Sequence, residues 1–330
     1  MIPKVSIIVP VYRVEDYVER CVKSLFGQTL DDLEFIFIDD CGGDRSMEII
    51  QRTLEDFPER KSQVKFIYHA ENMGVSKARQ DGVDIAAGEY IIHCDPDDWI
   101  ERNMYELLYN NAKNNNADLV ICNYRSVTDR GSRIITQQPE KLTSISILQS
   151  ISGVSRISLH GGLVNKLIRS SYYKDVHFPK DINYCEDVAV MFQILQHNLK
   201  ISYLNKSLYN YKTDRPGSIC KIVDSRTLKM DRRLIDFIST CVGDKPDYRS
   251  CKYSFIVSTI FNRAFLYGNL SNKEFMNTYK SFYPYLHYNN QIHRIDIVLL
   301  ELAMKGHFNL GKKLHFTLLK AKLFVRQWIK

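Results

Sequence analysis

Apolar runs of strand length alternate with amphipathic stretches over the first 125 residues of the chain. Largely apolar runs, typical of strands covered on both faces, lie at residues 5–12, 33–40, 64–69, 89–95 and 118–124. Between these runs, apolar side chains recur at helical spacing over residues 15–28, 44–54, 75–86 and 104–114. This alternation predicts βαβ units and an α/β fold, with a mostly parallel sheet flanked by helices.

The pattern changes in the rest of the chain. Residues 126–183 show no clear period, and a helix is predicted over residues 186–197. The remainder predicts amphipathic helices at roughly 223–242, 250–267, 272–281, 292–305 and 312–329. We therefore expect an α/β domain over residues 1–219 and a helical C-terminal region over residues 220–330.

Polar residues gather where the predicted strands end. They are Pro10 and Tyr12 after the first strand, Asp39 and Asp40 after the second, and Asp95, Asp97 and Asp98 after the fourth. In open α/β sheets, ligands bind beyond the carboxyl ends of the strands. The sequence therefore predicts a ligand site at this edge of the sheet.

The sequence Asp95-Pro96-Asp97-Asp98 carries the most specific chemistry. Three carboxylates within four residues repel one another unless a cation lies between them. Mg²⁺ or Mn²⁺ takes one or two carboxylates and completes its shell with phosphate oxygens and water. A metal held in this way neutralises the charge that develops on a leaving diphosphate. The alternative is a solvated acidic turn that caps the helix beginning near Arg102.

Two long stretches resemble the family-2 glycosyltransferases with a GT-A fold. They read VSIIVPVYRVEDYVERCVKSLFGQTLDDLEFIFIDD and ENMGVSKARQDGVDIAAGEYIIHCDPDDW. The later stretches NKLIRSSYY, FPKDINYCEDVAVMFQIL, ISYLNKSLYNYK and RPGSI are similar to the bacterial capsule and lipopolysaccharide branch of that family. The resemblance implies a Rossmann-like, mostly parallel sheet and a catalytic, nucleotide-sugar-binding domain over residues 1–219.

The resemblance also implies how a nucleotide-sugar donor is bound. Pro10 and Tyr12 would line the base pocket, with Tyr12 stacking on a base that is usually uracil in this family. Asp39 and Asp40 would accept hydrogen bonds from the base or the ribose, and Arg79 would lie near the diphosphate. Each side chain also has a purely structural explanation, as packing at a strand end or on a helix.

The same resemblance assigns the acidic motif and two cations. Asp95 would contact the ribose or the donor sugar, and Asp97 and Asp98 would hold the Mn²⁺ or Mg²⁺. Lys166 and Arg215 are candidates for contact with the donor diphosphate or for a closing loop.

Glu186 and Asp187 form a second candidate site. An acceptor hydroxyl that attacks an anomeric carbon must lose a proton, and a positioned carboxylate is the usual general base. Asp187 occupies the place of the base in the ED motif of the resembled family. Direct in-line attack would invert the anomeric centre without an enzyme nucleophile. The alternative is that these carboxylates only stabilise the beginning of a helix, by ~0.3–1 kcal/mol.

Composition bounds the environment of the protein. The eight cysteines include no CxxC pair and no zinc-finger spacing, which favours reduced, structural cysteines and a cytoplasmic location. The sequence contains no run of ~18 apolar residues, so no transmembrane helix is predicted. The formal net charge is +7. The last 29 residues contain seven Lys or Arg and no acidic residue, so this tail accounts for the whole excess.

The tail also has an amphipathic pattern. On a helix starting at residue 312, one face carries Leu314, Leu318, Ala321, Val325, Trp328 and Ile329. A basic helix of this kind suits an anionic membrane surface, so we expect peripheral contact at the inner face of the cell membrane. The alternative is packing of the apolar face on the core. Nucleic acid is not an expected partner.

The sequence therefore predicts an inverting, metal-dependent glycosyltransferase. It would move a sugar from a nucleotide diphosphate, expected to be UDP, to a hydroxyl of a glycan or lipid-linked glycan in surface polysaccharide biosynthesis. One alternative is a sugar nucleotidyltransferase, which would need a Gly-rich loop after the first strand. A metal-dependent phosphatase would need an early DxD nucleophile, and a third alternative is a catalytically inactive module that binds a nucleotide or glycan.

Overall fold

The computed structural model describes residues 2–214, 225–243, 245–266, 268 and 270–328. The chain forms two compact units, one of residues 1–147 and 159–216 and the other of residues 148–158 and 217–330. The boundary expected after Ile219 falls in residues 215–224, outside the described residues. The inclusion of residues 148–158 in the second unit was not predicted.

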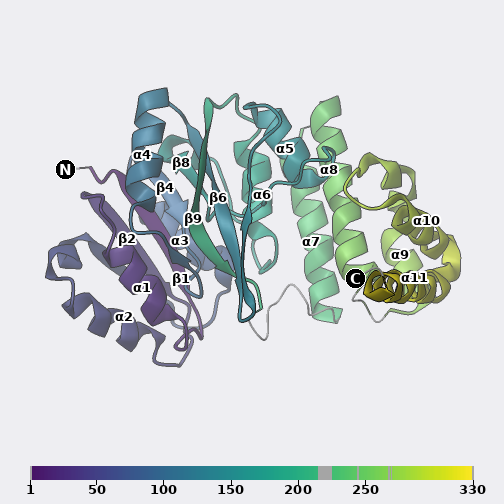
Figure 1. Cartoon of the computed structure of the whole chain (residues 1–330), viewed down its shortest axis with the longest axis horizontal. Helices are drawn as coiled ribbons and strands as arrows, with labels where there is room; N and C mark the ends of the chain where they lie inside the picture. Colours follow the sequence, from purple (N-terminus) through teal and green to yellow (C-terminus); the bar gives the residue numbers. More distant parts are fainter. Residues whose placement is uncertain (1, 215–224, 244, 267, 269, 329–330) are drawn as a thin grey trace. The chain divides into compact units, whose positions relative to one another are not determined.

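One nine-stranded sheet organises the first unit (Figure 1). Its strand order is β3-β2-β1-β4-β8-β6-β9-β5, and β7 pairs with β6. The strands are β1 (Val5–Val11), β2 (Leu33–Asp39), β3 (Val64–Tyr68), β4 (Tyr90–His93), β5 (Trp99–Ile100), β6 (Leu119–Thr128), β7 (Gly131–Ile135), β8 (Lys166–Arg169) and β9 (Ile201–Lys212). The five strands predicted from the apolar runs are confirmed as β1, β2, β3, β4 and β6.

The sheet has a parallel part and a mixed part. Strands β3, β2, β1 and β4 are parallel neighbours, and β6 runs parallel to β9. Between them lies β8, which is antiparallel to both β4 and β6. Residues 126–183 show no period in the sequence. In the structure this interval contains β7, β8 and the helix α5 (Ser144–Ser152).

Helices cover both faces of the parallel part. They are α1 (Val18–Phe26), α2 (Ser46–Glu55), α3 (Val75–Ile85), α4 (Met104–Asn115) and, later in the chain, α6 (Glu186–Ile194). Alternate β1 residues such as Ile7 pack in one core with apolar residues of α1, α2 and α4. On the other face, a Cβ on Gly82 of α3 would lie 2.6 Å from the Cγ2 atom of Ile8. A glycine therefore lets α3 approach the sheet closely.

The second unit consists mainly of helices, as predicted. They are α7 (Ser225–Cys241), α8 (Pro246–Thr259), α9 (Asn272–Tyr279), α10 (Arg294–Leu302) and α11 (Phe308–Trp328). A buried core that includes Phe265, Phe275 and Leu300 joins them. Residues 148–158 attach to this unit because the Gln291 side-chain amide donates to the Ser150 carbonyl oxygen at 3.0 Å.

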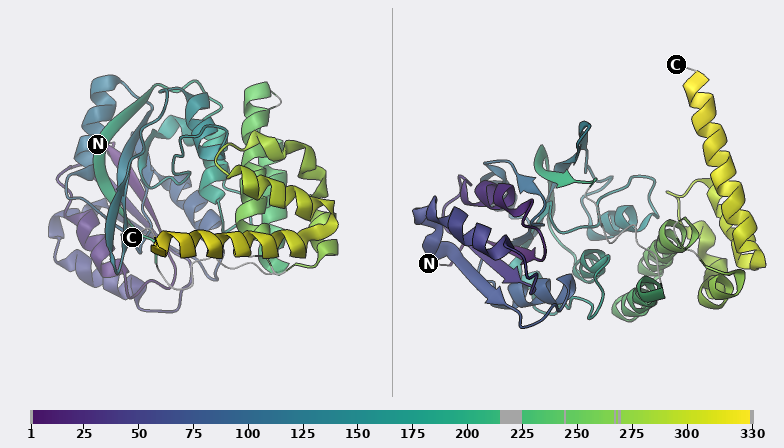
Figure 2. Two further views of the ribbon diagram at one scale, coloured as in Figure 1. Left: turned by 45° about the vertical axis from the view of Figure 1, so that its right-hand side comes forward. Right: turned by 90° about the horizontal axis from the view of Figure 1, so that it is seen from below.

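The helix α11 contains the predicted basic tail (Figure 2). Its beginning packs on the second unit, since Phe308 is buried and its ring centroid lies 4.5 Å from that of Phe275. Farther along, Leu314, Phe316, Leu318 and Leu319 are exposed. Within the described ranges, none of the helices combines the length and the apolarity that crossing a membrane requires.

Candidate active site

The carboxyl ends of β1, β2 and β4 lie side by side. In the parallel register, Val11 pairs with Asp39 and Ile8 pairs with His93. The polar residues that follow these strands therefore meet at one edge of the sheet. The predicted meeting of these strand ends is observed, and a ligand site at this edge stays a prediction.

Asp40 stabilises a loop at this edge. One of its carboxylate oxygens accepts hydrogen bonds from His69 Nδ1 (2.8 Å) and from the Met73 backbone N–H (2.7 Å). The other oxygen accepts from the Asn72 side-chain amide and from the Gly74 backbone N–H, both at 2.8 Å. Both oxygens thus have protein donors, and this geometry favours a role for Asp40 in fixing residues 72–74 over the expected hydrogen bond to a base or ribose.

The loop requires its glycine. Gly74 directly precedes α3 and has a φ of 87°, a left-handed conformation that other residues rarely adopt. A Cβ there would also lie 2.3 Å from the side-chain oxygen of Asn183. The loop that leads to α6 therefore packs tightly against the beginning of α3.

The residues predicted for the nucleobase are more accessible than Asp40. Tyr12 is 39% exposed, and the guanidinium carbon of Arg13 lies 5.1 Å from the centroid of its ring. Asp39 is half-buried, and one of its oxygens accepts from the Cys41 backbone N–H at 3.1 Å. Pro10 is buried within β1 and supports this end of the strand.

Arg79 of α3 connects the two acidic motifs. Its Nη2 donates to Asp95 at 2.7 Å, and its Nε donates to Glu186 at 3.2 Å. Arg79 is only 4% exposed, and its Nη1 has no hydrogen-bond partner among the described residues. Because buried donors are nearly always paired in proteins, this nitrogen indicates a group that a ligand can satisfy.

The charges of this cluster are strongly coupled. Burial opposes the charge of Arg79, but Asp95, Glu186 and Asp187 together raise its pKa. Burial, together with the neighbouring Asp187, raises the pKa of Glu186 to about 7, while Arg79 opposes the shift. Removing Arg79 would therefore leave the buried Glu186 and the half-buried Asp95 without their counter-ion.

The carboxylates of the Asp95–Asp98 motif differ in their surroundings. Asp98 is 1% exposed and accepts from the Tyr209 hydroxyl at 2.6 Å and from the Lys212 backbone N–H at 2.7 Å. Burial, and then the charges of Asp97 and Asp95, raise the pKa of the Asp98 carboxyl well above its usual range. Asp97, in contrast, is half-buried. Asp98 is therefore held by β9, and Asp97 is the more accessible of the two predicted metal ligands.

A divalent cation needs further oxygen ligands at this site. Among the described residues, no group of three or more His, Cys, Asp or Glu side chains is arranged to hold a metal ion. The carboxylates nevertheless fit Mg²⁺ or Mn²⁺, because these ions take one or two carboxylates and complete their shell with phosphate oxygens and water.

Lys166 lies inside the protein. It is 1% exposed, and its Nζ donates to the carbonyl oxygens of His160 (2.7 Å) and Gly162 (2.6 Å) and to the side-chain oxygen of Asn165 (2.9 Å). Burial lowers the pKa of Lys166 to about 7, although Asp187 opposes the shift. Its three hydrogens are thus used within the protein. This geometry favours a structural role for Lys166 over the expected contact with a donor diphosphate.

Asp187 lies in the first turn of α6, beside the loop that Lys166 holds. One of its oxygens accepts from the Val188 backbone N–H at 2.7 Å. A Cβ on Gly162 would lie 3.0 Å from the other oxygen, Oδ2. The Asp187 side chain is half-buried, so a bound molecule can approach it. The remaining predicted cation, Arg215, lies outside the described residues.

Sequence reasoning missed several residues that organise the site. Tyr209 donates to Asp98, and its hydroxyl also accepts from the Asp95 backbone N–H at 3.2 Å. His69 joins Asp40 to Asp81, with its Nε2 3.0 Å from the Asp81 carboxylate. The stretches ISYLNKSLYNYK and ENMGVSKAR, which carry part of the resemblance, contain or adjoin these residues. These two stretches were therefore the sequence feature from which Tyr209 and His69 could have been found.

Comparison with known proteins agrees with this architecture. The model of the family described as Glycosyl transferase family 2 matches residues 6–167. The uncharacterized glycosyltransferase EpsJ of Bacillus subtilis is 32% identical over 227 residues, which are 67% of this chain and 64% of EpsJ. The glycosyltransferase GlyG of Streptococcus pneumoniae is 28% identical over 73% of this chain and 80% of its own length.

Solved structures show the same fold. Staphylococcus aureus TarS in complex with UDP-GlcNAc superimposes with a TM-score of 0.72 at 17% identity, over 96% of this chain and 92% of that one. The mannosyltransferase PcManGT from Pyrobaculum calidifontis, in complex with GDP-Man and Mn²⁺, gives a TM-score of 0.56 at 12% identity, over 95% and 87%.

The sheet, its acidic edge and these similarities define a GT-A fold of the glycosyltransferase class. The stretch that the family model matches, residues 6–167, belongs to glycosyl transferase family 2. The expected fold class is therefore confirmed.

The buried position of Lys166 yields a first prediction. Lys166→Met should lower the free energy of unfolding by about 1–3 kcal/mol, because the His160 and Gly162 carbonyl oxygens lose their donor. UDP affinity should change by less than about threefold, because Lys166 has no hydrogen left for a phosphate. Chemical denaturation and calorimetry measure the two quantities.

The exposed Lys180 offers a matched control, and Lys180→Met should leave both quantities nearly unchanged. An Lys166→Met protein of normal stability whose UDP affinity has fallen tenfold or more would instead establish a direct diphosphate contact.

Proposed function

We propose that the protein is an inverting, metal-dependent glycosyltransferase. It moves a sugar from a UDP-sugar to a hydroxyl of a glycan or lipid-linked glycan in surface polysaccharide biosynthesis. The observation that carries the proposal is the Arg79 bridge, with its Nη2 2.7 Å from Asp95 and its Nε 3.2 Å from Glu186. This bridge joins the acidic motif to Glu186, the neighbour of Asp187, which supports one site for the proposed donor-binding and base groups.

The donor would be bound at the edge formed by β1, β2 and β4. Tyr12 offers an exposed aromatic face for the base, with Pro10 beneath it in the strand, and Asp39 offers a carboxylate for the base or the ribose. Asp95 would contact the ribose or the donor sugar. The unpartnered Nη1 of Arg79 supports a place for an anionic group nearby. TarS, which has the same fold, is known in complex with UDP and with UDP-GlcNAc.

The metal would be held at the same motif. Asp97 is the proposed ligand. Asp98, which accepts hydrogen bonds from Tyr209 and Lys212 of β9, would orient the motif. When bound, Mn²⁺ or Mg²⁺ supplies positive charge to the departing diphosphate. PcManGT, which has the same fold, is known in complex with Mn²⁺.

Asp187 would act as the general base, and Glu186 would hold Arg79 beside it. In the proposed reaction an acceptor hydroxyl gives its proton to an Asp187 oxygen while the hydroxyl oxygen forms a bond to the anomeric carbon. The bond from that carbon to the diphosphate oxygen breaks on the opposite face, and UDP leaves with the bonding electrons. One displacement of this kind inverts the anomeric configuration.

The names of two relatives indicate which acceptors those proteins use. The poly(ribitol-phosphate) beta-glucosyltransferase of Bacillus spizizenii is 27% identical over 82% of this chain and 41% of its own length. The cholesterol galactosyltransferase of Borreliella burgdorferi is 30% identical over 66% of this chain. Because the names of these relatives indicate different acceptors, we base the proposed hydroxyl acceptor on the chemistry of the site.

The base assignment gives a second prediction. Asp187→Asn should lower the rate of UDP release from the UDP-sugar substrate by about 10²–10⁴-fold, because the amide cannot accept the hydroxyl proton. UDP affinity should remain within about threefold, because Asp187 takes no part in nucleotide binding. A panel of UDP-sugars with a UDP-detection assay measures turnover, and calorimetry measures affinity.

Two comparison variants make this experiment specific. Asp97→Ala should weaken metal-dependent UDP binding, whereas Asp84→Asn, on the exposed side of α3, should alter neither quantity. Near-normal turnover of Asp187→Asn would refute the base assignment. Absence of product formation from the unmodified protein would instead favour an inactive binding module.

The tail supports a second proposal, peripheral attachment to the inner face of the cell membrane. The exposed leucines of α11 lie among Lys313 and Lys320, and the segment from residue 302 onward contains no acidic residue. Side chains beyond residue 320 are not among those described. Apolar side chains flanked by cations suit an anionic lipid surface.

Liposome flotation tests the attachment. Replacing Leu318 and Leu319 together by Asn should lower the fraction that floats with phosphatidylglycerol vesicles by at least about tenfold, because the exposed apolar face is lost. Ile134→Asn, at an exposed position of β7, is the control. Flotation of the tail variant equal to that of the control would show that α11 does not bind lipid.

A further inference from the structure

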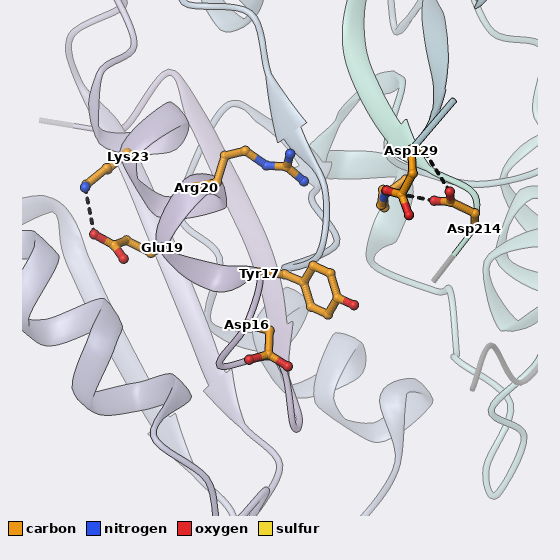
Figure 3. A pocket seen from close by; sticks show the side chains of 8 residues that line it. Asp16, Tyr17, Glu19, Arg20, Lys23, Asp129 and Asp214 are labelled. Carbon is orange, nitrogen blue, oxygen red and sulfur yellow. Dashed lines mark hydrogen bonds and ion pairs between the residues drawn. The ribbon is translucent and has the colours of Figure 1, made fainter. Parts of the chain in front are cut away.

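A cavity of about 770 Å³ opens beside the acidic motif of the first unit, and the proposed catalytic steps do not use it. The turn before α1 and the first turns of that helix line one side. The turn between β6 and β7 and the end of β9 line the other (Figure 3). All these segments belong to the same compact unit, so the cavity lies within the first unit.

Two contacts connect this cavity to the acidic motif. Arg20 lines the cavity, and its guanidinium carbon lies 3.5 Å from the centroid of the Trp99 ring. Lys212 lines the opposite side, and its backbone N–H donates to Asp98 at 2.7 Å. Trp99 and Asp98 adjoin Asp97. A molecule in the cavity would therefore lie next to the edge at which we propose that the donor binds.

The charges of the cavity argue against a phosphorylated ligand. Its lining contains four carboxylates and three cations. Lys23 is paired with Glu19 at 2.7 Å, and Lys212 is paired with Asp129 and, at 2.8 Å, with Asp214. Pairing with Asp129 and Asp214 raises the pKa of Lys212. The lysines are therefore already neutralised, and the excess of carboxylates would repel a phosphate.

The remaining groups suit a neutral sugar. Figure 3 shows the Tyr17 ring pointing from the beginning of α1 toward the side chains of Asp129 and Asp214. An aromatic ring with an apolar face and a polar tip can cover the apolar face of a pyranose. Carboxylates such as that of the exposed Asp16 accept hydrogen bonds from sugar hydroxyls, and charge-assisted hydrogen bonds of this kind are strong.

We propose that this cavity binds a neutral saccharide unit of the acceptor, with the Tyr17 ring beneath the sugar and Asp16 accepting from its hydroxyls. This inference rests on the proposed glycosyltransferase function, and it assigns a binding place and a chemical type to one unit of the acceptor. The saccharide would approach the donor from the side of Trp99. It would be a sugar residue without phosphate, even if the complete acceptor carries a phosphate elsewhere.

Acceptor kinetics test this site with p-nitrophenyl β-glucoside, β-galactoside and β-N-acetylglucosaminide as probes. The donor is the UDP-sugar that the full-length protein hydrolyses fastest in water, and UDP release is measured with and without each glycoside. At least one glycoside should accelerate UDP release. Tyr17→Ala should raise the KM for that glycoside by about tenfold, because the stacking surface is lost. Asp16→Asn should raise it in the same direction.

Matched variants separate binding from folding. Tyr17→Phe keeps the ring and should retain a KM close to that of the unmodified protein. Asp31→Asn removes an exposed carboxylate outside the cavity and should have no effect. Acceptor-independent hydrolysis should stay unchanged in all four variants, which shows that each variant is folded and binds its donor.

Three results would overturn the inference. They are an unchanged KM in Tyr17→Ala, no acceleration by any of the three glycosides, and inhibition by glucose 6-phosphate that is stronger than inhibition by glucose. The last result would indicate an anionic ligand. Failure of the proposed function looks different, because the unmodified protein would then neither bind UDP nor release it from any UDP-sugar, and both proposals would fall together.

Discussion

The active site depends on one buried guanidinium. Arg79 binds Asp95 at the end of β4 and Glu186 at the beginning of α6, two carboxylates that lie 91 residues apart in the sequence. Its position is fixed because Gly82, one turn farther along α3, allows that helix to pack closely on the sheet. Without this cation, the buried Glu186 would lose its counter-ion and the carboxylates of the cluster would repel one another. The ion pair thus determines where the acidic motif and the proposed base lie.

Around this bridge, several charged groups orient the site from within. Asp40 fixes the loop before α3, Asp98 joins the acidic motif to β9, and Lys166 holds the loop beside Asp187. Each is almost fully buried and has protein partners. Tyr12 and Asp97 are more accessible, and we propose that both contact the ligand. A site built in this way keeps its geometry before a substrate arrives, which lowers the cost of positioning reacting groups.

The sequence predicts the parallel part of the fold well, because β1, β2 and β4 have long apolar runs and their polar ends meet at one edge. It does not predict β8, whose four residues are too few to show a period, or the attachment of residues 148–158 to the second unit, which depends on distant hydrogen bonds. Motif spacing identified Asp40, Asp98 and Lys166 but could not separate ligand contacts from internal ones. Tyr209, a partner of Asp98, lies 111 residues farther along the chain.

Calorimetric titration of UDP into the purified protein, first with Mn²⁺ and then with EDTA, tests the central claim most directly. We expect saturable binding that requires the metal, because the acidic motif by itself would repel a diphosphate. Binding of equal strength in EDTA would contradict the proposed role of the motif. If neither UDP nor GDP, CDP or TDP bound in the presence of Mn²⁺, this result would contradict the proposal that the protein uses a nucleotide-sugar donor.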